Sequence, residues 1–109
     1  MSEIKSDTGP NLPHPADDEI QLAKVLFALS DPGRLELVRQ LQEAPLEAAR
    51  CHLTDPEIPK STKSHQMKVL REAGVIRNEP HGRGRLLSLR REALERRFPG
   101  LLEAVLGAL

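Results

Sequence analysis

The sequence predicts a mainly α-helical winged helix-turn-helix, in the order α-α-α-α-β-β-α. Three observations point to this fold. Segments with apolar residues at helical spacing occupy most of residues 17–73. Two strand-like stretches, 75–79 and 85–89, then flank a turn that contains glycine. A charged helical segment and an apolar one follow, so the pattern is that of packed helices interrupted by a two-stranded wing.

The length and charge of the chain favour a single domain with an anionic partner. With 109 residues it buries a modest core, which dimerisation would supplement. The formal net charge is zero, but residues 1–58 hold five Lys/Arg against eleven Asp/Glu, whereas residues 59–97 hold eleven against four. Such segregation produces a local positive field. Phe27 and Phe98 are the only aromatic residues, which disfavours single-strand binding by base stacking but not the gripping of a duplex.

The sequence predicts a cytoplasmic protein, because no apolar run reaches the ~18 residues of a membrane span and no signal-peptide pattern is present. Cys51 is the only cysteine, so an intrachain disulfide is excluded. Beside Arg50 and His52 it is either a redox-active thiol or a small buried hydrophobe, and the second interpretation is favoured. Neighbouring residues on a helix point in different directions, so we predict neither a metal site at Cys51 and His52 nor a cofactor.

The N-terminal part is predicted to be a tail followed by two helices. Residues 1–16, with three prolines and Gly9, read as a flexible tail, which leaves 17–109 as the folded domain. His14 lies in this tail and has no predicted role. A first helix, capped by Asp17 or Asp18, runs to Leu29, and its apolar residues on more than one face require a covering surface. A second helix is capped by Asp31, has Pro32 in its first turn and ends near residue 43.

The remaining elements follow from prolines, glycines and apolar spacing. A short helix over 46–53 precedes an irregular connection imposed by Pro56 and Pro59. The next helix starts at residue 60 or 61, buries Met67 and Leu70, and ends at Gly74 as its C-cap. The hairpin follows. A charged helix over 90–98 is stopped by Pro99 and Gly100, and the apolar segment 101–109 needs a partner surface.

Two stretches resemble the ArsR family of bacterial winged-helix repressors: "LFALSDPGRLELVRQL" and "KSTKSHQMKVLREAGVIR". The resemblance spans roughly residues 20–90 and rests on Asp31-Pro32-x-Arg34-Leu35 and on the run from Lys68 to Gly74. It implies a homodimer, paired through its first and last helices, that binds operator DNA and often releases it on sensing a metal or a redox change. The chain departs from the family in lacking a Cys-x-Cys metal motif, in carrying Lys63 at a usually apolar position, and in a wing without aromatics.

Side chains opposite the Met67–Leu70 stripe, near the start of that helix, are the candidates for entering the major groove. We assign base reading to Ser64 and His65, with Gln66 as a further candidate because glutamine pairs with adenine. Backbone anchoring is assigned to Lys60, Ser61, Thr62 and Lys68. Arg83 and Arg85, near the hairpin tip with His81, are expected to contact phosphate or the minor groove. Arg34 is a weaker phosphate candidate, with a local ion pair as its alternative.

No enzyme is predicted. Pro59-Lys60-Ser61 lacks the upstream glycines of a phosphate loop, and Ser61 with His65 lacks a positioned acid and an oxyanion site. The hypothesis is a homodimeric, sequence-specific, double-stranded-DNA-binding transcription regulator, acting as a repressor. The alternative is a winged-helix module that binds proteins and not DNA. The operator, the regulated genes and any inducer are not encoded in a recognisable form.

Overall fold

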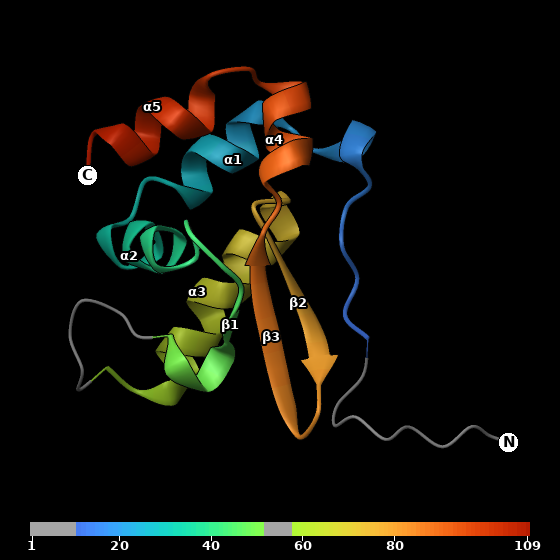
Figure 1. Cartoon of the computed structure of the whole chain (residues 1–109), viewed down its shortest axis with the longest axis vertical. Helices are drawn as coiled ribbons and strands as arrows, with labels where there is room; N and C mark the ends of the chain where they lie inside the picture. Colours follow the sequence, from blue (N-terminus) through green and yellow to red (C-terminus); the bar gives the residue numbers. More distant parts are fainter. Residues whose placement is uncertain (1–10, 52–57) are drawn as a thin grey trace, which may run out of the picture.

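The computed structural model describes residues 11–51 and 58–109. Five α-helices, two short 3-10 helices and a three-stranded antiparallel sheet make up this part of the chain (Figure 1). The sheet has the strand order β1-β3-β2. The elements in chain order are η1 (Asp17–Glu19), α1 (Leu22–Ala28), α2 (Pro32–Gln40), β1 (Leu46–Glu47), η2 (Ala48–Arg50), α3 (Lys60–Ala73), β2 (Ile76–His81), β3 (Gly84–Leu89), α4 (Arg91–Arg97) and α5 (Leu101–Gly107).

The molecule has two distinct ends (Figure 1). Helices α1, α4 and α5 lie together at the upper end, whereas the hairpin tip and the start of α3 lie at the lower end. Helix α3 packs against α1, α2 and β2, and so forms the centre of the fold. The core is built from the buried apolar residues of these elements, among them Val25, Leu37, Leu70, Ile76 and Leu87.

The second helix begins as predicted. The Asp31 carboxylate accepts a hydrogen bond from the Arg34 backbone N–H over 3.1 Å, and Pro32 occupies the first helical position. These are the interactions that satisfy an otherwise unpaired donor at a helix start. The helix ends at Gln40, slightly before the predicted end near residue 43.

The predicted first helix over 17–29 is wrong as a continuous element. It is divided into η1 and α1 by Ile20, whose backbone is extended with φ −73° and ψ 124°. Two tertiary interactions account for the break. The Ile20 side chain is 1% exposed in the core, and Arg97 donates a hydrogen bond to the Ile20 carbonyl, which is therefore engaged outside any helix. Burial of Ile20 and its carbonyl contact take precedence over helical continuation.

The predicted short helix over 46–53 is also wrong where the structure describes it. Leu46 and Glu47 form a strand that pairs with Leu87 and Leu86 of β3, and η2 follows. The pairing satisfies backbone groups at an edge of β3 that β2 leaves free. Cys51 then enters the core at 1% exposure, while His52 lies outside the described residues.

Helix α3 and the wing confirm the prediction. Met67 is 9% exposed and Leu70 is fully buried, and Gly74 ends the helix in the left-handed conformation with φ +89°. Strands β2 and β3 pair along their whole length, from Ile76–Leu89 to His81–Gly84. Only Gly82 and Arg83 remain to form the turn, so the wing is a tight hairpin with a cationic tip.

The two terminal α-helices leave apolar surface uncovered. The exposed large hydrophobic residues are Leu22, Leu26 and Phe27 on α1 and Leu109 after α5, at 46%, 48%, 62% and 54% exposure. Both helices lie at the upper end of the molecule (Figure 1). Within the described ranges no helix combines the length and apolarity needed to cross a bilayer.

Candidate nucleic-acid interface

The outer face of α3, defined here as Lys60, Ser61, Thr62, Ser64, His65 and Lys68, is exposed at all six positions. The helix is oriented by its inner face, where Met67 and Leu70 enter the core. The 3.6-residue period then places Ser61, His65 and Lys68 opposite, with Thr62 and Ser64 flanking them and Lys60 at the first residue of the helix. Four predicted phosphate contacts and two predicted base contacts therefore share one accessible surface at the start of a helix.

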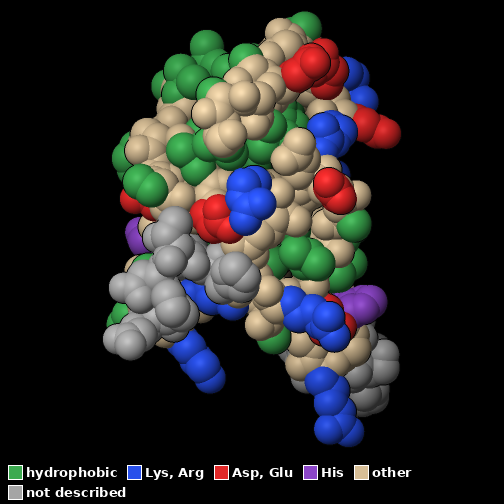
Figure 2. Space-filling model, turned by 60° about the vertical axis from the view of Figure 1, so that its left-hand side comes forward, with side chains coloured by type: hydrophobic (Ala, Val, Ile, Leu, Met, Phe, Trp, Pro, Cys, Tyr) green, Lys and Arg blue, Asp and Glu red, His purple; other side chains and the backbone are tan. Residues whose placement is uncertain are grey.

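The wing tip forms a second exposed polar surface at the same end of the molecule. His81, Gly82, Arg83 and Gly84 are all exposed. Figure 1 shows the hairpin tip at the lower end with the start of α3, and Figure 2 shows Lys and Arg side chains projecting from this end. Two projections with cationic side chains, a helix and a hairpin, are thus available to one extended anionic partner.

Arg34 does not reach this surface. Arg34 is only 7% exposed. Its guanidinium donates hydrogen bonds to the carbonyls of Ala28 and Phe27 over 2.7 and 3.1 Å. A third hydrogen bond, of 2.7 Å, runs from Nη1 to Gln66 Oε1. The predicted phosphate contact is therefore corrected, as is the alternative of a local ion pair. Arg34 joins the end of α1 to α3.

Gln66 belongs to the same network. Its amide nitrogen donates to Asp31 Oδ2 over 2.8 Å, while its oxygen accepts from Arg34. The side chain is half-buried and engaged at both polar atoms. These two hydrogen bonds hold the amide towards Asp31 and Arg34, and its assignment as an adenine reader stays a prediction. Helical periodicity placed Gln66 beside the outer face correctly but did not reveal its partners on α2.

Arg85 differs from Arg83 in being held against the hairpin. Its Nε donates to Asn78 Oδ1 over 2.8 Å and its Nη2 to the Asn78 carbonyl over 3.0 Å. Asn78 is on β2 and is 9% exposed. Arg83 lies in the turn and is exposed. Of the two wing arginines, Arg83 is therefore exposed at the tip, whereas Arg85 is held in place by its hydrogen bonds to Asn78.

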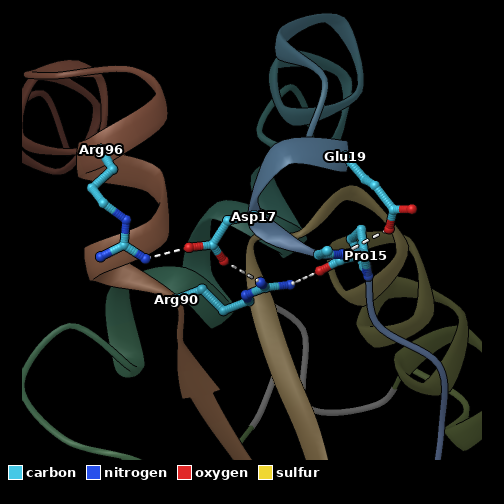
Figure 3. Close-up of polar contacts among 6 residues, drawn as sticks. Pro15, Asp17, Glu19, Arg90 and Arg96 are labelled. Carbon is cyan, nitrogen blue, oxygen red and sulfur yellow. Dashed lines mark hydrogen bonds and ion pairs between the residues drawn. The ribbon is translucent and has the colours of Figure 1, made fainter.

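Several arginines that contribute to the basic character of residues 59–97 face the N-terminal segment and not the lower end. Arg90, 6% exposed, donates to the Pro15 carbonyl over 2.7 Å and to Asp17 Oδ1 over 3.0 Å (Figure 3). Arg96 donates to the other oxygen of Asp17. The hydrogen bond from Arg96 is the main cause that holds the pKa of Asp17 below its ordinary value. Part of the positive charge is thus paired with the N-terminal segment and not directed to the lower end.

His14, for which no role was predicted, is joined to the hairpin. Its Nε2 accepts a hydrogen bond from the Asn78 backbone N–H over 3.0 Å, although the two residues are 64 positions apart. Residues 11–16 lie within the predicted tail. Within this range Pro13, His14 and Pro15 are hydrogen-bonded to the rest of the domain. The opposite charges of the acidic N-terminal part and the arginine-rich C-terminal part were the sequence signal for the ion pairs of Asp17 with Arg90 and Arg96, but not for the His14 contact.

Cys51 is placed as a core residue. Burial raises the pKa of its thiol, and the positive charge of Lys63 opposes this only in part. A raised pKa reduces the thiolate fraction and so the reactivity. Across residues 11–51 and 58–109, no three His, Cys, Asp or Glu side chains gather in a way that would hold a metal ion.

Known proteins resemble the chain in sequence and in structure, although no family model matches it. YceK of Bacillus subtilis, described as an uncharacterized HTH-type transcriptional regulator, is 34% identical over 91 residues, covering 83% of this chain and 90% of YceK. The HTH-type transcriptional regulator NmtR of Mycobacterium tuberculosis is 33% identical over 90 residues, covering 79% of this chain and 71% of NmtR.

Two solved structures share the fold. A crystal structure of an ArsR-family transcriptional regulator superimposes with a TM-score of 0.62 at 24% identity, covering 76% of this chain and 90% of that one. The transcriptional repressor BigR of Xylella fastidiosa superimposes with a TM-score of 0.54 at 29% identity, covering 71% of this chain and 85% of BigR. Sequence and fold therefore lead to the same group of proteins.

Proposed function

Because the chain belongs to the ArsR family of winged helix-turn-helix transcriptional regulators, we propose that it is a repressor that binds operator DNA as a homodimer. Members of this family regulate transcription and are not enzymes, in agreement with the sequence-based prediction. The observation that carries the proposal is the exposure of the outer face of α3 and of the wing tip at one end of the molecule.

Within this proposal the contacts divide by position. Ser64 and His65, on the outer face of α3, read base edges in the major groove, where hydroxyl and imidazole groups find donors and acceptors. Arg83 follows the phosphates or enters the minor groove, and Arg85 adds a second wing contact braced by Asn78. Arg34 and Gln66 are left out, because the network between α1, α2 and α3 occupies them. The remaining outer-face residues anchor the backbone: Lys60, Ser61, Thr62 and Lys68.

The exposed apolar residues of α1, together with Leu109 after α5, support pairing through the opposite end of the molecule. A second copy packed there would remove the exposed side chains of Leu22, Leu26 and Phe27 from water. A twofold dimer built there would direct two α3 helices the same way, and half-sites on a duplex are about 34–36 Å apart. We further propose that this dimer acts in the cytoplasm, with residues 17–109 as the domain that binds DNA and dimerises.

The test is the salt dependence of binding to a labelled duplex taken from upstream of the chain's own gene. Several phosphate contacts should give a steep negative slope of log K against log salt, of about −0.9 per phosphate neutralised. If Lys60 and Lys68 are both replaced by alanine, two phosphate contacts are lost, so the slope should become less negative by about 1.8. Lys24→Ala, on α1 at the other end, should leave the slope unchanged.

A flat salt dependence for the parent would contradict the proposal. Light scattering in the same buffer should give the mass of a dimer. A stable dimer that bound no duplex, whether from the upstream region or scrambled, would favour the alternative function, a module that binds other proteins.

A further inference from the structure

The segment Leu12–Asp17 connects α3 to the wing, the two elements whose relative position matters for the proposed DNA binding. It runs alongside the hairpin from near the wing tip towards α4 (Figure 1). Arg71 of α3 donates to the Pro13 carbonyl, the Asn78 backbone of β2 donates to His14, and Arg90, after β3, donates to the Pro15 carbonyl. One short stretch therefore binds the DNA-facing helix, the wing and the base of the sheet.

The bond to His14 completes a sheet edge. Strand β2 is an outer strand of the sheet, so the N–H groups that point away from β3 have no strand partner. The Asn78 N–H instead donates to His14 Nε2 over 3.0 Å in a partly buried position. A buried donor left without an acceptor is costly, and an uncovered edge invites pairing with other chains. His14 meets both demands with one nitrogen.

Asn78 connects this bond to the wing arginine. Its backbone donates to His14, while its side-chain and backbone oxygens accept from Arg85. A groove of about 400 Å³ lies between α3 and the hairpin, and Leu12 lines it together with Ser64, Lys68 and Arg85. The start of the segment therefore lies beside the groups assigned to DNA. His14 is hydrogen-bonded directly to Asn78, the residue that holds Arg85.

We propose that residues 12–17 are a clamp that positions the wing against α3, with His14 and Asn78 as positioning residues, and that protonation of His14 opens the clamp. The proposal rests on the proposed DNA-binding function. According to this proposal, acid weakens DNA binding by protonating His14, which does not itself contact DNA.

Only a neutral imidazole can accept a hydrogen bond at Nε2. The charged groups around His14 come from each element packed on the clamp: Arg71 of α3, Arg77 and Glu79 of β2, and Arg90 after β3. Burial and then the three arginines lower the pKa of His14 from 6.5, and Glu79 opposes them. Protonation is therefore disfavoured while the clamp is closed. The stability that the clamp adds is complete above pH 6.5 and is lost as the pH falls through the lowered pKa.

The other anchor of the clamp does not change in this range. The hydrogen bond from Arg96 keeps the pKa of Asp17 below its ordinary value of 3.8, so Asp17 stays ionised wherever His14 titrates. Mild acid thus separates the His14 end, which opens, from the Asp17 end, which stays attached to Arg90 and Arg96.

Three variants of the full chain test the clamp. His14→Gln keeps an acceptor oxygen that does not titrate, and His14→Phe removes the acceptor. Lys24→Gln is the control, since it changes an exposed side chain of α1 at the opposite end of the molecule. Duplex affinity is measured at pH 7.5 and pH 5.5 by fluorescence anisotropy. The protection of the Asn78 amide from hydrogen exchange is measured by NMR in the free protein at the same two pH values.

From pH 7.5 to 5.5 the parent should lose roughly threefold to tenfold in affinity relative to His14→Gln, the range expected for one net hydrogen bond. Lys24→Gln should show the same loss relative to His14→Gln as the parent does. His14→Phe should be weakened already at pH 7.5. Protection of the Asn78 amide should fall with pH in the parent and stay constant in His14→Gln.

Identical pH responses in the parent and in His14→Gln, in both measurements, would overturn the clamp. If neither the parent nor any variant bound a duplex, the proposed DNA-binding function would be contradicted instead. The exchange of the Asn78 amide, recorded without DNA, would still decide whether His14 closes the clamp.

Discussion

Ile20 lies directly against Gly74. A Cβ atom built on Gly74 would come within 2.7 Å of Ile20 Cγ1, a distance that non-bonded carbon atoms do not adopt. Gly74 also has φ +89°, where L-residues with side chains are strained. The end of α3 and the break before α1 therefore depend on each other, although 54 residues separate them in the sequence.

Gly74→Ala should lower the free energy of unfolding by about 3 kcal/mol, from backbone strain together with displacement of Ile20. Urea unfolding followed by circular dichroism gives the value. Gly100→Ala is the matched control, since Gly100 has φ +83° but a Cβ added there would meet no atom within 4 Å, so it should cost about 1 kcal/mol. Equal losses in the two variants would mean that contact with Ile20 contributes nothing.

Arg34→Lys should also destabilise the fold, by about 2 kcal/mol, because lysine cannot bond the Ala28 and Phe27 carbonyls and Gln66 together. The urea midpoint measures the change. Arg39→Lys makes the same chemical exchange at an exposed pair with Glu36 on the same helix, and should leave the midpoint unchanged. A midpoint of Arg34→Lys equal to that of the parent would show that the Arg34 network does not stabilise the fold.

Gln66→Ala should reduce stability by about 1 kcal/mol and leave DNA sequence preference intact, because its amide bonds Asp31 and Arg34. The measurement pairs urea unfolding with the ratio of affinities for the upstream duplex and a scrambled one. A selective loss for duplexes that contain one particular A·T pair would instead support Gln66 as an adenine reader.

His65→Ala and Arg83→Ala should affect DNA binding in different ways. Loss of a base contact on the outer face of α3 should reduce the upstream-to-scrambled affinity ratio roughly tenfold. Loss of the tip arginine should weaken both duplexes alike and reduce the salt slope by about one. Titrations at two salt concentrations separate these outcomes. Parental behaviour in both variants would show that the assigned surfaces are not the binding surface.

Cys51 should react slowly with a thiol reagent in the folded protein. Burial raises the pKa of its thiol, so at pH 8 both access and the thiolate fraction are reduced. The rate with an aromatic disulfide should increase about a hundredfold or more in denaturing urea, where the thiol is exposed. Rapid labelling of the folded chain would favour the redox interpretation of this residue.

The elements predicted correctly are those whose signals are local. Asp31 and Pro32 start a helix through contacts within one turn, and Gly74 ends another through its own φ angle. The wing follows from two strand-like stretches around a glycine-containing turn. The exposed outer face of α3 follows from Met67 and Leu70, because a helix that buries one side must present the other.

The elements missed are those that distant residues decide. Leu46 is a strand residue because Leu87 offers a partner, and Ile20 breaks a helix because the core and Arg97 hold it. His14 is joined to the hairpin because the outer edge of β2 passes beside it. No window of sequence around these residues contains the partner, so periodicity and propensity give no sign of the outcome.

The sequence alone determined that this chain carries a winged helix-turn-helix, which side of α3 is polar, and that its positive charge is concentrated in the second half. Only the tertiary structure decided which polar side chains are available. Arg34 and Gln66 look like surface groups in the sequence, yet a buried guanidinium must pair every donor it can, and it finds its acceptors on α1 and α3. Hydrogen-bond satisfaction of buried groups is a property of the packed molecule and of no single segment.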